Sequence, residues 1–158
     1  SYGMVDGGSA SLAELCALLS SLAEVSILQR YAVTGSIHQQ GEVQAIGGVN
    51  EKIEGFFDIC RARGFAPGQG VIIPATNKEH LMLREDVVEA AASGEFSIHA
   101  VSTVDEAIAL LTGREPGVRG QDGRFPVGSL NRAVAYKLAQ YSRIRQGRSL
   151  QAPGKSGE

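Results

Sequence analysis

The chain has 158 residues, of which 43% are apolar and 20% are charged, and its formal net charge is −2. A length of this order suits a single folded domain, and these proportions exclude a disordered, collagen-like or strongly basic nucleic-acid-binding chain. No stretch approaches the roughly 18 apolar residues of a membrane-spanning helix, and the first residues lack the pattern of a signal peptide. We therefore expect a cytoplasmic protein.

The near-neutral net charge conceals an asymmetry along the chain. Residues 1–112 carry six basic and fourteen acidic side chains, a net charge of −8, whereas residues 113–158 carry nine basic and three acidic ones, a net charge of +6. The change falls in a glycine- and proline-rich stretch, residues 113–123, which is typical of a linker or surface loop. We therefore predict a main domain over residues 1–112 and a basic extension over residues 113–158.

The first predicted elements are a helix and a pair of strands. Apolar residues recur at helical spacing over residues 9–23, and the Gly7-Gly8 turn precedes them. Residues 31–37 and 42–46 have the composition of strands, and a short polar link separates them. We expect these strands to form an antiparallel pair.

Further along, helices and strands alternate. A second helix is expected from Asn50, as its N-cap, to Arg63. Residues 70–74 and 97–101 are apolar enough to form buried strands, with a short helix between them over about residues 84–92. This alternation predicts an α/β or α+β fold, in which helices pack on a mixed β-sheet.

The last predicted helices begin at recognisable caps. Thr103 and Glu106 form a capping box for a helix that ends near Leu111. In the extension, Ser129 caps one further, basic helix, and residues from about 147 to 158 are predicted to be disordered. This helix carries few aromatic residues for base stacking, so docking on a neighbouring protein surface is favoured over contact with nucleic acid.

Cysteine and histidine usage indicates no metal or disulfide site. Cys16 and Cys60 fall on the apolar stripes of predicted helices, which favours buried thiols. No two of the three histidines stand at metal-ligand spacing: His38, His80 and His99.

Two glycine turns carry the candidate chemistry. Ser9 follows Asp6-Gly7-Gly8 at the start of the first predicted helix, where backbone N–H groups can stabilise an oxyanion, although a serine there is also an ordinary N-cap. Lys52 lies in the first turn of the second predicted helix, after Gly47-Gly48, where the helix dipole disfavours a cation. The dipole and desolvation by Phe56 would lower the pKa of a lysine there, as a general base requires, unless its side chain extends into solvent.

Four ordered blocks resemble the proteolytic domain of Lon, a Ser-Lys protease: Asp6-Gly7-Gly8-Ser9-Ala10, Thr34-Gly35-Ser36-Ile37, Gly41-Glu42-Val43 and Ile46-Gly47-Gly48-Val49-Asn50-Glu51-Lys52. The resemblance covers about residues 3–111. The segment Val71-Ile72-Ile73-Pro74-Ala75-Thr76-Asn77 is also similar to a strand and loop of that family.

The resemblance implies a role for each matching residue. Ser9 would be the nucleophile and Lys52 the base that takes its proton. Thr34 would accept a hydrogen bond from the lysine ammonium, Asp6 would play a supporting role, and backbone N–H groups around Gly8 and Ser9 would stabilise the oxyanion.

Three features of the chain depart from the family pattern. Gly8 and Ser11 stand where the family usually has proline and glycine, and Asn50 replaces a common basic residue, so that the second block resembles the B-type or Lon-like bacterial branch. In Lon several strands precede the nucleophile, whereas here eight residues do, so the N-terminal strands of the domain are expected to be missing.

By this resemblance, the leading hypothesis is an endopeptidase that hydrolyses unfolded polypeptides in a homo-oligomeric, hexameric ring. The chemistry needs no cofactor, and no phosphate-binding loop occurs in the chain, so any ATP would bind an upstream ATPase module. The acidic main domain argues against nucleic acid as a substrate. The alternative is a catalytically silent Lon-like module that serves assembly or partner binding.

Overall fold

The computed structural model describes residues 10–150, with the side chains of residues 11–147. The described elements are strands β1 (Ala10–Ser11), β2 (Tyr31–Val33), β3 (Ser36–Ile37), β4 (Val43–Gln44), β5 (Gly70–Pro74) and β6 (Ser97–Val101), helices α1 (Leu12–Ala23), α2 (Val49–Arg63), α3 (Glu85–Ser93), α4 (Val104–Thr112) and α5 (Leu130–Leu150), and the 3₁₀ helix η1 (Ala75–His80). The α/β class and the packed helices are confirmed.

The strands form two small sheets. One is antiparallel, in the order β1-β3-β4, and the other is parallel, in the order β2-β5-β6. The predicted antiparallel pair is present between β3 and β4. The predicted strand over residues 31–37 is divided, however, because the chain turns at Gly35, where φ is +130°. Its first half joins the parallel sheet and its second half the antiparallel one.

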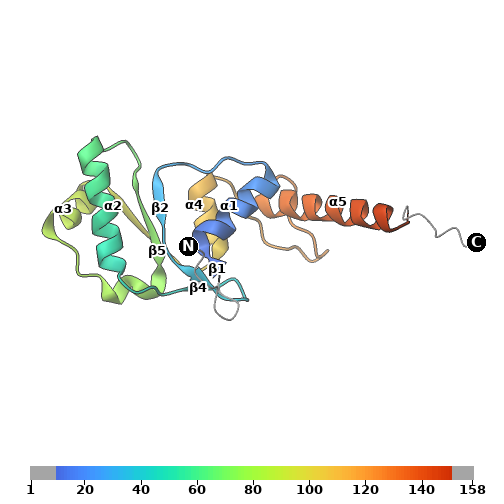
Figure 1. Ribbon diagram of the computed structural model, residues 1–158, viewed down its shortest axis with the longest axis horizontal. Helices are drawn as coiled ribbons and strands as arrows, with labels where there is room; N and C mark the ends of the chain where they lie inside the picture. The colour runs from blue at the N-terminus through green and yellow to red at the C-terminus, as the bar shows by residue number, and fades with distance from the viewer. Residues whose placement is uncertain (1–9, 151–158) are drawn as a thin grey trace, which may run out of the picture.

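Helices cover both faces of the parallel sheet (Figure 1). Helices α2 and α3 connect successive parallel strands and lie on one face, and α1 and α4 lie on the other. Strand β5 shows why, because side chains alternate along a strand. Val71 and Ile73 pack with the α2 and α3 side chains, whereas Ile72 packs with those of α1 and α4.

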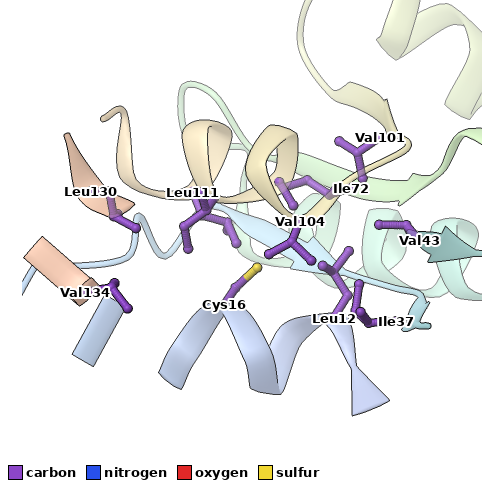
Figure 2. Close-up of a cluster of buried hydrophobic side chains, with 12 residues drawn as sticks. Leu12, Cys16, Ile37, Val43, Ile72, Val101, Val104, Leu111, Leu130 and Val134 are labelled. Atoms are coloured by element: carbon purple, nitrogen blue, oxygen red, sulfur yellow. The ribbon is translucent and has the colours of Figure 1, made fainter. Parts of the chain in front are cut away.

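The core between α1 and α4 extends into the C-terminal helix. Figure 2 shows Cys16 of α1 pointing towards α4, with Leu130 and Val134 of α5 at one end of the same cluster. Ser129 caps α5 as predicted, since its Oγ accepts the Arg132 N–H at 3.2 Å. Both cysteines are free and buried, as predicted.

Several predicted boundaries differ from those of the structure. Helix α1 begins at Leu12 rather than Ser9, because Ala10 and Ser11 pair with β3 and the Ser11 Oγ caps the helix. Helix α2 begins after Gly48, and Asn50 lies inside its first turn. Helix α5 continues to Leu150, into the stretch predicted to be disordered.

The first turns of α5, with Leu130 and Val134, pack on the core. The rest of the helix extends away from the other elements (Figure 1). No helix in the described part of the chain is both long and apolar enough to cross a membrane.

Candidate active site

The antiparallel sheet joins the two glycine motifs through the Thr34-Gly35 turn. Its strand β1 directly follows Ser9 in the chain, and its strand β4 leads into the Gly47-Gly48 turn. Ser11 pairs with Ser36, which in turn pairs with Gln44. The candidate residues Asp6, Gly8 and Ser9 themselves lie outside the described residues.

The start of α1 is tied tightly to this turn. The Leu12 N–H donates to the carbonyl oxygen of Gly35 at 3.0 Å, and the Leu12 side chain is fully buried. Because α1 begins at Leu12, Ser9 does not stand in its first turn.

Gly35 allows α1, β4 and the end of β5 to approach one another closely. A Cβ atom on Gly35 would lie 3.1 Å from the Val43 Cγ1 and 3.2 Å from the Pro74 Cγ. Its φ of +130° is also one that residues with a side chain rarely adopt. Glycine is thus required by both the backbone conformation and the space around it.

Thr34 is bound to the parallel sheet by two hydrogen bonds to one acceptor. Its N–H donates to the Ile72 carbonyl oxygen at 2.9 Å, and its hydroxyl donates to the same oxygen at 3.1 Å. A hydroxyl has a single proton to donate and two lone pairs. Since the proton is used, the Thr34 Oγ1 can only accept a further hydrogen bond, which suits an ammonium group as its partner.

Lys52 lies on the solvent-facing side of the first turn of α2. Gly48, with φ +69°, precedes the helix, and its carbonyl oxygen accepts the Lys52 N–H at 3.1 Å. Val49 and Ile53 are buried beside it, whereas the Lys52 side chain is exposed. Among the described side chains, no hydrogen-bond or ion-pair partner faces its ammonium group. The Lys52 side chain therefore extends into solvent, and the desolvation by Phe56 expected from the sequence is not found in the structure.

Asn77 holds the segment that leads into Gly47-Gly48. Its side chain is 1% exposed, and its amide bonds both backbone groups of Ile46. The Oδ1 accepts the Ile46 N–H at 2.9 Å, and the Nδ2 donates to the Ile46 carbonyl oxygen at 3.0 Å. The Asn77 amide thus pairs with the Ile46 backbone as a neighbouring strand would. This pairing fixes the direction in which the chain enters α2.

Asn50 makes a second amide contact with the same region. Its Nδ2 donates to the His80 carbonyl oxygen at 2.9 Å, and its Oδ1 accepts the Met82 N–H at 2.8 Å. Asn50 does not cap α2, because both ends of its amide are hydrogen-bonded to the backbone at the end of η1 and just after it. Within the described residues, no cluster of three or more His, Cys, Asp or Glu side chains is placed to hold a metal ion.

The comparison with known protein families decides the assignment. Residues 4–113 match the model of the Lon protease (S16) C-terminal proteolytic domain. This chain belongs to that Lon family. The match spans all four motif blocks, so Ser9, Thr34 and Lys52 all fall within the Lon-matching region.

Relatives of this Lon domain occur in bacteria and archaea. Two bacterial proteins that carry the name "Putative Lon protease homolog" are 54% identical over 111 residues, or 70% of this chain, in Escherichia coli, and 46% identical over 138 residues, or 87% of this chain, in Haemophilus influenzae. An archaeal Lon protease of Methanocaldococcus jannaschii is 40% identical over 111 residues, or 70% of this chain. The matches cover 19%, 23% and 15% of these relatives, so the chain spans about a fifth of their length.

Asn77 and Asn50 position the Lon-type motif, although neither is among the site residues that the motifs predict. Asn77 ends the segment Val71–Asn77, which resembles the family, and it lies three residues after the apolar strand β5, so an amide close behind such a strand is the available signal. The partner of that amide, Ile46, lies 31 positions away in the chain, and spacing alone does not reveal such a contact.

Proposed function

We propose that this Lon domain is a serine endopeptidase in which Ser9 is the nucleophile and Lys52 the general base. The observation that carries the proposal is the β1-β3-β4 sheet, which links the strand after Ser9, the Thr34-Gly35 turn and the approach to Lys52 in one hydrogen-bonded unit. Segments that are far apart in the chain, and that border these three motifs, thereby pair in one sheet.

In the proposed reaction, the Ser9 Oγ attacks the scissile carbonyl carbon while the neutral Lys52 amine takes the hydroxyl proton. Backbone N–H groups around Gly8 and Ser9 stabilise the oxyanion, with Asp6 in a supporting role. The Lys52 ammonium then gives its proton to the leaving amine, and an acyl-enzyme forms. Water, deprotonated by Lys52, hydrolyses this ester and restores Ser9.

Lys52 has to be neutral to act as the base. Its side chain is exposed to water in the structure. A bound polypeptide that covers the first turn of α2 would remove this water and favour the neutral amine. The Thr34 Oγ1, which has only lone pairs left to offer, would orient the ammonium form between the two proton transfers.

The wider setting is proposed from the family. Unfolded polypeptides are the proposed substrates, a homo-oligomeric, hexameric ring the proposed assembly, and the cytoplasm the proposed location. No cofactor takes part in the peptide chemistry. ATP would act through an ATPase module upstream of this domain.

A second candidate function is a Lon-like module without catalysis, which serves assembly or partner binding. The observation that favours it is the exposed Lys52 side chain, which has no partner among the described residues. The substitutions of the family pattern at Gly8 and Ser11 point the same way.

Hydrolysis of an unfolded, fluorescently labelled protein, with and without ATP, separates the two functions. We expect Ser9→Ala to abolish cleavage and Lys52→Ala to reduce it by about 10²–10⁴-fold, the range for a lost general base. Lys78→Ala, which removes another exposed lysine, is the matched control and should leave the rate unchanged. A wild-type protein that does not cleave, or a Lys52→Ala variant with full activity, would favour the silent module.

A further inference from the structure

Helix α5 carries a row of apolar side chains that continues past the edge of the core. Leu130 and Val134, at the start of the helix, are buried in the cluster that includes α1 and α4. Leu138, Tyr141 and Ile144 follow at helical spacing, and their side chains are 52%, 51% and 53% exposed. We call these three residues the α5 stripe. Large apolar side chains exposed along one helix face indicate a surface that a partner covers.

The charge around the α5 stripe restricts the chemistry of that partner. The 21 residues of α5 include no acidic side chain and five basic ones: Arg132, Lys137, Arg143, Arg145 and Arg148. Arg145 lies one turn after Tyr141 on the same side of the helix, and its guanidinium group has no hydrogen-bond or ion-pair partner among the described residues. A second α5 helix would bring like charges together. The partner surface therefore has to be apolar at its centre and acidic at its rim.

Helix α3 presents such a surface. Val88 and Ala92 are exposed on its outer face, and a glutamate stands three residues before each of them, Glu85 and Glu89. Neither glutamate side chain has a hydrogen-bond or ion-pair partner in the part of the chain that the structure describes. We call these four residues the α3 patch. Its two free carboxylates are the charges that the α5 stripe lacks.

The other exposed apolar residues on helices of the main domain fit the α5 stripe less well. Large apolar side chains are also exposed at Leu18 and Ile59. Leu18 has a single carboxylate within one turn, that of Glu14, and Ile59 is followed one turn later by a cation, Arg63. The α5 stripe and the α3 patch also match in length, at about 9 Å and about 10 Å along their helices for a rise of 1.5 Å per residue.

The α5 stripe and the α3 patch lie at opposite ends of the molecule (Figure 1). These ends also differ in charge, since residues 1–112 carry a net charge of −8 and residues 113–158 one of +6. We propose that the α5 stripe of one copy of this chain packs on the α3 patch of a second copy, where Arg145 bonds Glu85 or Glu89. Such a contact joins unlike surfaces head to tail, so it repeats from copy to copy.

The proposed contact adds a specific interface to the homo-oligomeric assembly of this Lon domain, and it rests on that proposed assembly. It does not depend on the chemistry of Ser9 and Lys52. Helix α5 lies beyond residues 4–113, so the match to the Lon proteolytic domain does not include the α5 stripe.

Disulfide cross-linking between two variants of the full chain tests the contact. One variant carries Leu138→Cys, and the other carries Val88→Cys and a tag that changes its size, so that a mixed dimer is recognised on a non-reducing gel. Tyr136→Cys replaces Leu138→Cys in the matched control, because Tyr136 is also exposed on α5 but lies two residues away and faces the opposite side of the helix. Both native thiols are buried and stay in place.

We expect oxidation to join Leu138→Cys to Val88→Cys. The yield of mixed dimer should be at least about fivefold lower for Tyr136→Cys with Val88→Cys, because a disulfide forms only where two Cβ atoms come within about 4 Å of each other.

Charge reversal tests the rim of the contact. Arg145→Glu, added to the Leu138→Cys variant, should lower the yield of mixed dimer by at least about fivefold, because it places like charges opposite one another. Glu85→Lys/Glu89→Lys, added to the Val88→Cys variant, should then restore the yield, since both sides have changed sign.

Mass photometry of the unmodified chain and a peptide-cleavage assay separate the possible failures. Homo-oligomers that give no mixed disulfide, an equal yield from Tyr136→Cys, or a reversed charge pair that does not restore the yield would overturn this contact alone. A chain that stays monomeric and gives no mixed disulfide would overturn both the contact and the homo-oligomeric assembly. Cleavage of unfolded protein reports on the peptidase function independently of these results.

Discussion

The buried side chain of Asn77 bonds both backbone groups of Ile46, two positions before the glycine that caps the Lys52 helix. One side chain thereby connects the middle of η1 to the segment that enters α2. We expect Asn77→Ala to lower the free energy of unfolding by about 2–4 kcal/mol, because two buried backbone groups lose their partners. Urea unfolding followed by circular dichroism measures this change.

Asn50→Ala is the comparison for Asn77. It also removes two amide contacts, but at a more exposed position where water can replace them. Its cost should be about 1 kcal/mol. Equal losses from the two variants would show that burial of Asn77 is not what makes its contacts important.

Gly35→Ala should be more damaging than the same substitution at Gly41, where the space around the new side chain is open. The new Cβ would press on Val43 and Pro74 at a backbone conformation with φ +130°. We expect a loss of about 2–4 kcal/mol from strain and overpacking together. Gly41→Ala, where φ is +82° but no atom lies within 4 Å, isolates the conformational part and should cost about 1 kcal/mol. Thermal unfolding of the pair decides whether the tight space at Gly35 matters.

Thr34 is expected to position Lys52 rather than to react. Thr34→Val keeps the N–H bond to Ile72 but removes the oxygen that would accept from the ammonium, so peptide cleavage should fall by about tenfold or more while stability changes by about 1 kcal/mol. Thr34→Ser should restore cleavage. The pH–rate profile should also move in Thr34→Val, and an unchanged profile would assign Thr34 a purely structural role.

Cys16 makes stability depend on pH in alkaline solution. Burial raises the pKa of its thiol to about 11 from an ordinary 9.0. Between these values the unfolded chain loses the proton and the folded chain keeps it, so the stabilisation is complete below pH 9 and is lost as the pH rises to 11. The stability advantage of the wild type over Cys16→Ala should therefore shrink by about 2–3 kcal/mol across this window. An advantage that stays constant in urea titrations would contradict the assignment.

The sequence predicted elements whose signals are local, and it misplaced those that depend on distant contacts. The capping box located α4, and the Thr103 side chain does cap it by accepting the Glu106 N–H. The turn at Gly35 was missed because residues 31–37 read as one β-rich run, and only the approach of Leu12, Val43 and Pro74 requires a break there.

The helix starts illustrate the same limit. Asn50 and Ser9 are of residue types that favour N-caps, but Gly48 and Ser11 occupy the positions next to the helices. Asn50 instead bonds residues that lie 30 and 32 positions away in the chain. Ser11, and not Ser9, is the N-cap of α1, because Ala10 and Ser11 pair with β3 before the helix begins. Tertiary contacts, and not the N-cap preference of a residue type, therefore determine where α1 and α2 begin.

The most direct test of the Ser9–Lys52 assignment is mass-spectrometric mapping of a fluorophosphonate adduct. The account predicts modification of Ser9 in the wild type, loss of that modification in Lys52→Ala and its retention in Lys78→Ala. Modification of Ser9 that persists unchanged in Lys52→Ala, or an adduct on another serine, would contradict it.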